Sequence, residues 1–402
     1  MTKNLTELKY RLRALTVFAD LKNDPVIESL SDFLFWIDKE DCQTEQIEFY
    51  SSFTEAIFKS ESGHLGKHIE SICCDCENVY VKQIGSGKMP NDHIVSAAKT
   101  ELQTLQLVAN LTKEDLCDGI EFKAYLPSFP SGEVDVAASF TERTENIAKY
   151  GYGIYAKNRM FYIDEQSTIV PVKHPDATTL SELVDYEAER QIVIDNTKAL
   201  LAGKPAANIL LTGDAGTGKS STVKAVVNEL YGKGLRIIEV RKDQLCAIPK
   251  ILDELANNPL KFILFIDDLS FLKDDDNYSA LKAVLEGSVS AKSRNVVIYA
   301  TSNRRHIIKE KFSDREGDDV HRNETLQELI SLSERFGIHI TFGKPTKATY
   351  LHIVHHLAKE SGIAMDENEL DLLAERFALA RGGRSARLAR QFVDGLISAR
   401  NE

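Results

Sequence analysis

Eight consecutive residues, 213–220 with the sequence GDAGTGKS, have the spacing of a loop that binds phosphate. The three glycines allow backbone angles and close approach that side chains would prevent, so main-chain amides can point at phosphate oxygens. Lys219 supplies a positive charge to the outer phosphates, and the Ser220 hydroxyl can ligate Mg²⁺. The residues expected to surround the phosphates are Gly213, Asp214, Ala215, Gly216, Thr217, Gly218, Lys219, Ser220 and Ser221.

A second candidate site is the segment KFILFIDD, residues 261–268. Its apolar run predicts a buried parallel strand, and such strands deliver functional side chains from their carboxyl ends. Asp267 would ligate Mg²⁺. Alone, the aspartate pair could be a solvated strand end or a helix cap; beside a phosphate loop, the magnesium role is favoured.

Alternating strands and helices must position these residues. Short apolar stretches separated by helical periodicity predict a parallel sheet covered on both faces. The five expected strands are 208–212, 235–240, 262–266, 296–300 and 338–342. Three helical stretches follow, roughly 346–360, 367–380 and 384–400, and predict a helical subdomain at the carboxyl end.

The chain upstream has a different pattern. Residues 1–150 are predicted to be mainly helical, with Leu5, Leu8, Leu12 and Leu15 on one helix face and similar patterns over 26–37 and 93–116. Alternating stretches at 153–156, 160–163 and 168–172 predict a small hairpin, followed by the linker KHPDATT. The predicted domains are therefore 1–150, 151–179 (hairpin and linker), 180–343 (α/β) and 344–402 (helical).

Composition supports a globular chain. The 402 residues are 43% hydrophobic and 27% charged. The longest apolar runs are far shorter than a membrane span, and residues 1–10 are too polar for a secretory signal, so we expect no membrane association and a cytoplasmic location. Six cysteines include one CCDC cluster without a second ligand pair at zinc spacing, which favours reduced thiols over a metal site.

Charge argues against one class of partner. The net charge is −12, and residues 1–175 carry 27 acidic and 18 basic side chains. An acidic surface repels phosphate backbones, so the amino-terminal part is a poor candidate for binding nucleic acid.

With these motifs, residues 180–402 resemble an AAA+ ATPase module: an α/β P-loop NTPase with a five-stranded parallel sheet and a C-terminal helical lid, here preceded by a mainly helical N-terminal domain. The segments GTGKSS, DDLSF, TSNRRH and SERFG also look like a bacterial AAA+ family of uncharacterised function. The resemblance implies that a strand ending in Asn303 (sensor 1) lies between the phosphate-loop and aspartate strands. Ser302, or a simple strand cap, is the alternative to Asn303.

The same resemblance implies further site residues. Arg335 would be an arginine finger that reaches a neighbouring subunit's nucleotide, although a surface salt bridge is the alternative. Arg387 best matches the lid arginine, sensor 2, with Arg384 as a competitor. Val184 and Tyr186 would surround the adenine; the family usually has a glycine where Asp185 stands, and an ordinary helix start is equally compatible with the segment.

The implied function is Mg-ATP binding at the interfaces of a homo-oligomer, with slow, assembly-dependent hydrolysis that remodels or regulates a protein partner. Asp268 stands where the family commonly has glutamate; it is one methylene shorter but still a base. The segment 241–250 lacks the aromatic and glycine of a threading loop, and Tyr278 is the other candidate for an inner surface. Two alternatives are open: a replication-initiator or loader-like switch that uses Arg304, Arg305 and His306 on DNA, and an ATP-binding scaffold with negligible turnover.

Overall fold

A computed structural model describes residues 5–37, 39, 42–269, 276–286, 294–303 and 334–400, with only the backbone for 276–279 and 400. The chain divides into two compact units: residues 1–157 with 257–259, and residues 158–256 with 260–402. Each unit has its own hydrophobic core.

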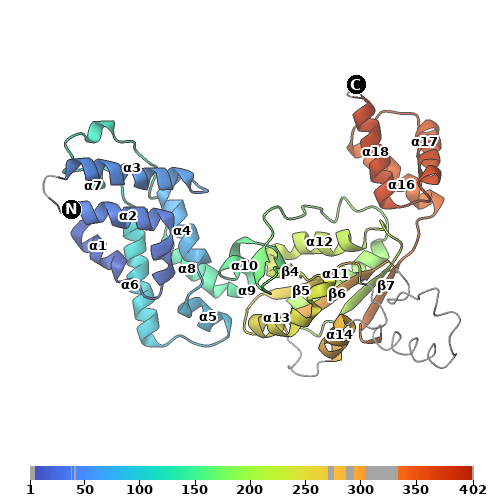
Figure 1. Cartoon of the computed structure of the whole chain (residues 1–402), viewed down its shortest axis with the longest axis horizontal. Coiled ribbons are helices and arrows are strands. Elements are labelled where there is room, and N and C mark those ends of the chain that lie inside the picture. Colours follow the sequence, from blue (N-terminus) through green and yellow to red (C-terminus); the bar gives the residue numbers. More distant parts are fainter. Residues whose placement is uncertain are drawn as a thin grey trace. The chain divides into compact units, whose positions relative to one another are not determined.

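The first unit is helical (Figure 1). Its described elements are α1 (Leu5–Arg13), η1 (Ala19–Asn23), α2 (Pro25–Trp36), α3 (Gln43–Lys59), α4 (Leu65–Asp75), α5 (Val79–Gly85), α6 (Asp92–Ala109), α7 (Lys113–Leu116), η2 (Lys123–Tyr125), α8 (Val136–Glu145), α9 (Ile147–Tyr150) and α10 (Ile154–Lys157). The core that these helices share includes Phe33, Tyr50, Phe53 and Ile69, all fully buried.

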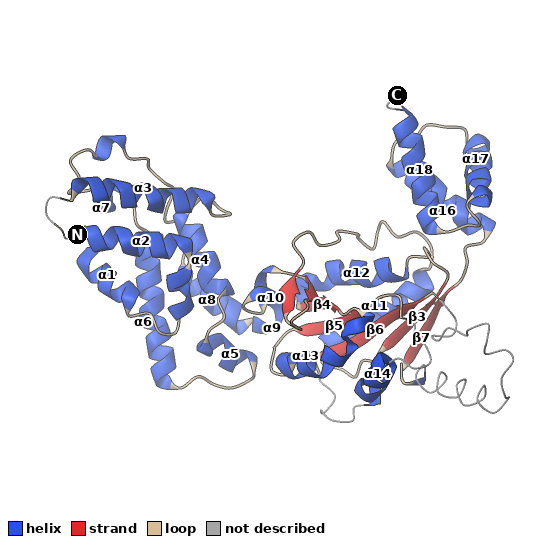
Figure 2. Ribbon diagram, viewed as in Figure 1, coloured by secondary structure: helices blue, strands red, loops and turns tan. Residues whose placement is uncertain are grey.

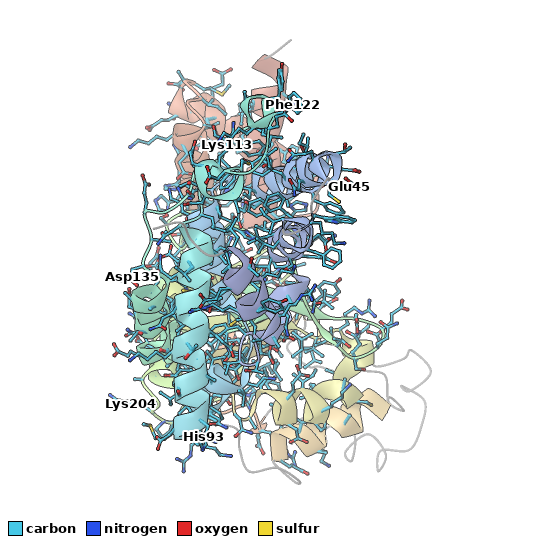
Figure 3. All side chains as sticks on the ribbon, turned by 90° about the vertical axis from the view of Figure 1, so that its left-hand side faces the viewer. Glu45, His93, Lys113, Phe122, Asp135 and Lys204 are labelled. Carbon is cyan, nitrogen blue, oxygen red and sulfur yellow. The ribbon has the colours of Figure 1, made fainter. Side chains whose placement is uncertain are left out.

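Two predictions for this unit are corrected. The helical pattern over 93–116 is two helices, because α6 ends at Ala109 and Thr112 begins α7 with a capping box. Figure 3 shows α6 along its length, with His93 in its first turn. The stretch 153–156 is a turn that leads into the helix α10, not a strand: Gly151 and Gly153 have φ values of 72° and 61° and turn the chain into α10.

The second unit is built on a sheet. Its described strands are β1 (Met160–Ile163), β2 (Ile169–Pro171), β3 (Ile209–Gly213), β4 (Leu235–Glu239), β5 (Lys261–Ile266), β6 (Val296–Ser302) and β7 (Ile338–Phe342). Their order is β2-β1-β4-β5-β6-β3-β7. The predicted count of five strands is wrong, because the hairpin joins the sheet: β1 pairs parallel with β4, and β2 pairs antiparallel with β1.

The five strands expected from their apolar runs form the parallel part, β4-β5-β6-β3-β7. The strand β6, which ends next to Asn303, lies between β3 and β5. Because all five strands run in one direction, their carboxyl ends meet at the same edge, and the residues that follow β3, β5 and β6 are brought together there.

Helices cover both faces of the sheet. They are α11 (Glu187–Leu201), α12 (Lys219–Leu230), η3 (Tyr231–Lys233), η4 (Lys242–Ala247), α13 (Ile248–Leu255) and α14 (Asp276–Glu286). Val193 of α11 and Val223 of α12 share one core with Ile209, Ile263 and Tyr299 of the strands. Figure 2 shows α13 and α14 on the other side of the strands from α12.

Three further helices follow β7 near the positions that periodicity predicts: α16 (Lys347–Glu360), α17 (Glu367–Ala380) and α18 (Ala386–Arg400). Thr346 caps α16 and Asp366 caps α17 through side-chain acceptors. Their small separate core contains Tyr350, Leu370 and Phe392.

Candidate functional site

The phosphate loop connects β3 to α12, as its sequence predicts. Gly213, Gly216 and Gly218 have φ values of 139°, 78° and 94°, a region that L side chains rarely adopt. A Cβ atom on Gly213 would lie 2.1 Å from the carbonyl oxygen of Phe342. Gly218 immediately precedes α12, so the loop leads to a helix N-terminus, where free amides and the helix dipole favour an anion.

Lys219 is 5% exposed and lies under this loop. Its Nζ donates hydrogen bonds to the carbonyl oxygens of Gly213 at 2.9 Å and Asp214 at 2.8 Å, and to Asn303 Oδ1 at 3.1 Å. Burial lowers the pKa of Lys219 below its ordinary value, and the carboxylates of Asp267, Asp214 and Asp268 oppose that effect. The ammonium is thus held at the loop by protein acceptors that a phosphate group could replace.

A hydroxyl and a carboxylate converge beside the lysine. Ser220 Oγ donates to Asp267 Oδ1 at 2.7 Å. The carboxylate oxygen and the hydroxyl oxygen are both hard ligands of the kind that Mg²⁺ accepts. Ser220 lies in the first turn of α12, and Asp267 follows the end of β5. These residues therefore fit a magnesium ion bound together with a nucleotide.

Asp268 has an unusual backbone conformation, with φ of 53°. Asn303 Nδ2 donates to Asp268 Oδ1 at 2.7 Å, and the backbone N–H of Asp268 donates to Thr301 Oγ1 at 3.0 Å. Asn303 thereby bridges Lys219 and Asp268. A left-handed backbone is strained at a residue other than glycine, and it persists only where surrounding contacts stabilise it.

The three helices α16–α18, called the helical bundle below, contribute two arginines to the cleft: Arg387 and Arg390, both on α18. The backbone N–H of Arg387 donates to the carbonyl of Gly216 at 3.2 Å, which joins the start of α18 to the phosphate loop. Arg384 does not line the cleft, since its guanidinium binds both oxygens of Glu375 at 2.8 and 2.6 Å. The hydrogen bond and charge of Arg384 lower the pKa of Glu375 below its usual range.

The segment before α11 forms the apolar end of the cleft, where Val184 and Tyr186 lie. The Tyr186 ring packs on Phe342 with centroids 5.3 Å apart, and its hydroxyl donates to the Gly343 carbonyl at 2.6 Å. Asp185, where the AAA+ resemblance leads us to expect glycine, has φ of 61°, so the turn keeps the conformation that glycine favours. The Asp185 carboxylate is 3.2 Å from Nδ1 of His352 on α16.

Together these residues surround a cleft of about 830 Å³. Its described lining includes residues 215–222 of the phosphate loop and α12, both aspartates, Asn303, and the apolar Val184, Ile353 and Leu357. A cleft that is charged at one end and apolar at the other matches the two ends of a nucleotide. The sequence did not single out Thr178, Glu182, Arg190, Thr301 and Gln391, which also line it. For Thr301, the signal was its place two residues before Asn303.

The structure does not bring every candidate into this cleft. Arg335 is not among the described residues that line it, and its guanidinium forms an ion pair with Glu286 at the end of α14. The side chain of Tyr278 and the residues Arg304, Arg305 and His306 lie outside the part of the chain that the structure describes.

The CCDC cluster has the features of structural thiols. Among the described residues, no group of three or more His, Cys, Asp or Glu side chains is placed to hold a metal. Burial raises the pKa of Cys73 well above its ordinary value and that of Cys74 and Cys76 to about 12. Among the helices that the structure describes, none is long and apolar enough to cross a membrane.

The chain is similar to several solved structures. Three matches are structures of the Thermotoga maritima RuvB Holliday junction branch migration motor: one of the motor itself (TM-score 0.37, 16% identity) and two of point mutants (0.37, 15% and 0.39, 16%). Each alignment covers 54% of this chain, and the chain spans 63 to 64% of the length of those RuvB chains. These values assign neither a partner nor an activity.

The sequence comparisons give two results. No curated protein matches this sequence. Residues 156–400, which include every site residue discussed above, match the model of a family described as "Protein of unknown function (DUF815)". Because this match covers more than half of the 402 residues, the chain belongs to that family.

Proposed function

We propose that this chain is an AAA+ type protein that binds Mg-ATP in the cleft and hydrolyses it slowly, in a way that depends on assembly. The observation that carries the proposal is the convergence of Lys219, Ser220, Asp267, Asp268 and Asn303 at one edge of the sheet and at the N-terminus of α12. The position of β6 between β3 and β5 supports the AAA+ assignment, because the resemblance expects the sensor strand there.

Each group has a chemical role in this proposal. The loop amides and Lys219 bind the phosphates, while Ser220 and Asp267 hold the metal ion. Magnesium, when bound, neutralises charge on the outer phosphates. Asp268 accepts the proton of the attacking water, and Asn303 orients that carboxylate. Val184 and Tyr186 pack beside the base.

Arg387 and Arg335 would contact nucleotides in two different subunits. Arg387 lines the cleft from α18, so it would contact the phosphates when the helical bundle closes over them. Arg335 lies away from its own cleft and would reach the nucleotide of an adjacent copy, which makes turnover dependent on a homo-oligomer. Breaking the Arg335–Glu286 ion pair would be part of that change.

Hydrolysis in this scheme drives a change of shape that acts on a protein partner. The acidic amino-terminal half disfavours DNA as the partner. A scaffold that binds ATP without turnover differs only in rate, so a phosphate-release assay separates the two.

Nucleotide binding tests the foundation of the proposal. We expect Mg-ATP and Mg-ADP to raise the thermal unfolding temperature of the wild-type chain and to leave Lys219→Ala unaffected, since binding stabilises the folded form by mass action. Lys224→Ala, on the same helix but not in the lining of the cleft, is the matched control and should respond as the wild type does. Equal responses of the wild type and Lys219→Ala would reject the site.

A further inference from the structure

The end of β6 holds the residues that follow β5 through a set of hydrogen bonds. Thr301 Oγ1 contacts Asp267 and Asp268; the Thr301 carbonyl accepts from the N–H of Leu269 at 2.7 Å. Ser302 Oγ donates to the Leu269 carbonyl at 2.9 Å, and Asn303 binds the Asp268 side chain. Residues 301–303 thus hold residues 267–269 through five hydrogen bonds, three of which involve Thr301.

Within this set the Thr301 hydroxyl touches both candidate carboxylate residues. It donates to Asp267 Oδ1 at 2.5 Å and accepts the Asp268 N–H at 3.0 Å. The directions are defined, because an N–H only donates and an ionised carboxylate only accepts. Thr301 is 2% exposed, so water has little access to replace these bonds.

The two bonds have different consequences. The bond to Asp267 supports the carboxylate oxygen that also accepts from Ser220 at 2.7 Å. When Ser220 turns toward a metal ion, Thr301 still restrains Asp267. The bond from the Asp268 N–H fixes the orientation of the peptide group between Asp267 and Asp268, and Asp268 itself has a left-handed backbone. With this backbone, the Asp268 side chain lies within hydrogen-bond distance of Asn303.

We propose that Thr301 is a positioning residue that orients the magnesium-binding and the water-activating aspartates through one buried hydroxyl. This inference rests on the proposed function. Thr301 itself would contact neither nucleotide phosphate nor metal; it acts through Asp267 and Asp268. A threonine that merely fills the strand would act only through its shape, which valine reproduces.

The test compares Thr301→Val, which keeps the branched shape, with Thr301→Ser, which keeps the hydroxyl. The matched control is Thr212→Val: Thr212 is 7% exposed and lies opposite Ser302 at the end of the neighbouring strand β3, and its hydroxyl contacts Thr341. If Thr301→Val does not fold, Thr301→Ala removes the same hydroxyl with less bulk.

The first readout does not need turnover: binding of a fluorescent ADP analogue is titrated with Mg²⁺. In Thr301→Val, the Mg²⁺ concentration for half-maximal binding should rise about 10-fold or more, the effect of losing a hydrogen bond to a charged group. The second readout is phosphate release, for which kcat should fall about 10- to 100-fold while KM for ATP changes much less. Thr301→Ser should restore both values most of the way, and Thr212→Val should match the wild type.

The outcomes separate the two proposals. Wild-type magnesium dependence in Thr301→Val, or equal defects in Thr301→Val and Thr301→Ser, would overturn the role of the hydroxyl. If the wild type binds nucleotide without turnover, hydrolysis is rejected. If Thr301→Val then still needs more Mg²⁺ than the wild type for half-maximal binding, the role of Thr301 is supported. A wild-type protein that binds no nucleotide would reject both.

Discussion

Asn303 donates its side-chain amide to the carboxylate of Asp268 at 2.7 Å. The oxygen of the same amide accepts from Lys219 at 3.1 Å, so one planar group links the candidate base to the lysine that we expect to bind phosphate. Because Asp268 has a left-handed backbone, and both its N–H and its carboxylate are hydrogen-bonded, its carboxylate has a defined place in the site.

The length of the Asp268 side chain is therefore matched to Asn303. We predict that Asp268→Glu lowers phosphate release about 10-fold or more, because the added methylene moves the carboxylate from its position opposite Asn303, and misplacement of about 1 Å is costly in catalysis. Nucleotide affinity, measured with a fluorescent analogue, should change little. Asp268→Asn serves as the control without charge. Faster release by Asp268→Glu would show instead that the shorter residue keeps turnover slow.

The phosphate loop gives a prediction about backbone space. Gly213→Ala should abolish nucleotide binding and lower the unfolding free energy of its unit by about 1–3 kcal/mol, because the new Cβ meets the Phe342 carbonyl in a strained conformation. Gly232→Ala, in η3 with open space around a Cβ, is the matched control and should bind normally. Thermal unfolding with and without Mg-ADP measures both effects. Normal binding by Gly213→Ala would contradict the loop geometry.

Much of this architecture was predictable from local patterns. Continuous apolar runs such as 209–211 and 262–266 are buried within the sheet, which is why they indicate parallel strands without knowledge of partners. The phosphate loop and the two aspartates could also be predicted, because their residue types and the flanking strands suffice to place them at one sheet edge.

The failures have identifiable physical causes. The hairpin's place in the sheet depends on pairing between Phe161 and Ile238, a contact across 77 residues that no local period encodes. Thr301 has the appearance of a β-branched strand residue, and its role depends on the register of β6 against β5. The left-handed turn at Asp185 could not be predicted, because an aspartate in the sequence does not indicate a φ of 61°.

The two arginines of the helical bundle should have separable effects. Arg387→Ala should weaken ATP binding about 10-fold or more, since it removes a charged donor that lines the cleft. Arg384→Ala should leave affinity little changed and lower the thermal unfolding temperature, since it breaks the bidentate pair with Glu375. Titrating a fluorescent nucleotide against both variants checks the assignment. The reverse pattern would make Arg384 the nucleotide contact.

The first unit has a pH-dependent contact that its tryptophan can report. Asp24 caps α2 and binds Nε2 of His68 at 2.9 Å. Burial raises the pKa of Asp24, but the hydrogen bond and charge of His68, together with the backbone N–H groups of Val26 and Ile27, lower it more, and the net pKa lies below the ordinary value. The ionised form therefore stabilises the fold above about pH 4, the unfolded value, and the contribution is lost as the pH falls through the folded value.

We predict that Asp24→Asn lowers the free energy of unfolding by about 1–3 kcal/mol at pH 5, and by clearly less at pH 3. Trp36, the one tryptophan in the sequence, lies at the end of α2, so its fluorescence follows this unit during denaturant unfolding. Asp32→Asn, at an exposed position of the same helix, is the control and should show no such dependence. A difference between wild type and Asp24→Asn that is constant with pH would contradict the assignment.

The central claim is that this chain hydrolyses Mg-ATP slowly at a site completed by a second copy. The most direct measurement is steady-state phosphate release per protomer, across a range of protein concentrations, with Lys219→Ala as the background and Arg335→Ala as the variant lacking the trans contact. We predict release above background that rises with protein concentration in the wild type and is lost in Arg335→Ala. Wild-type release no greater than that of Lys219→Ala at every concentration would contradict the account.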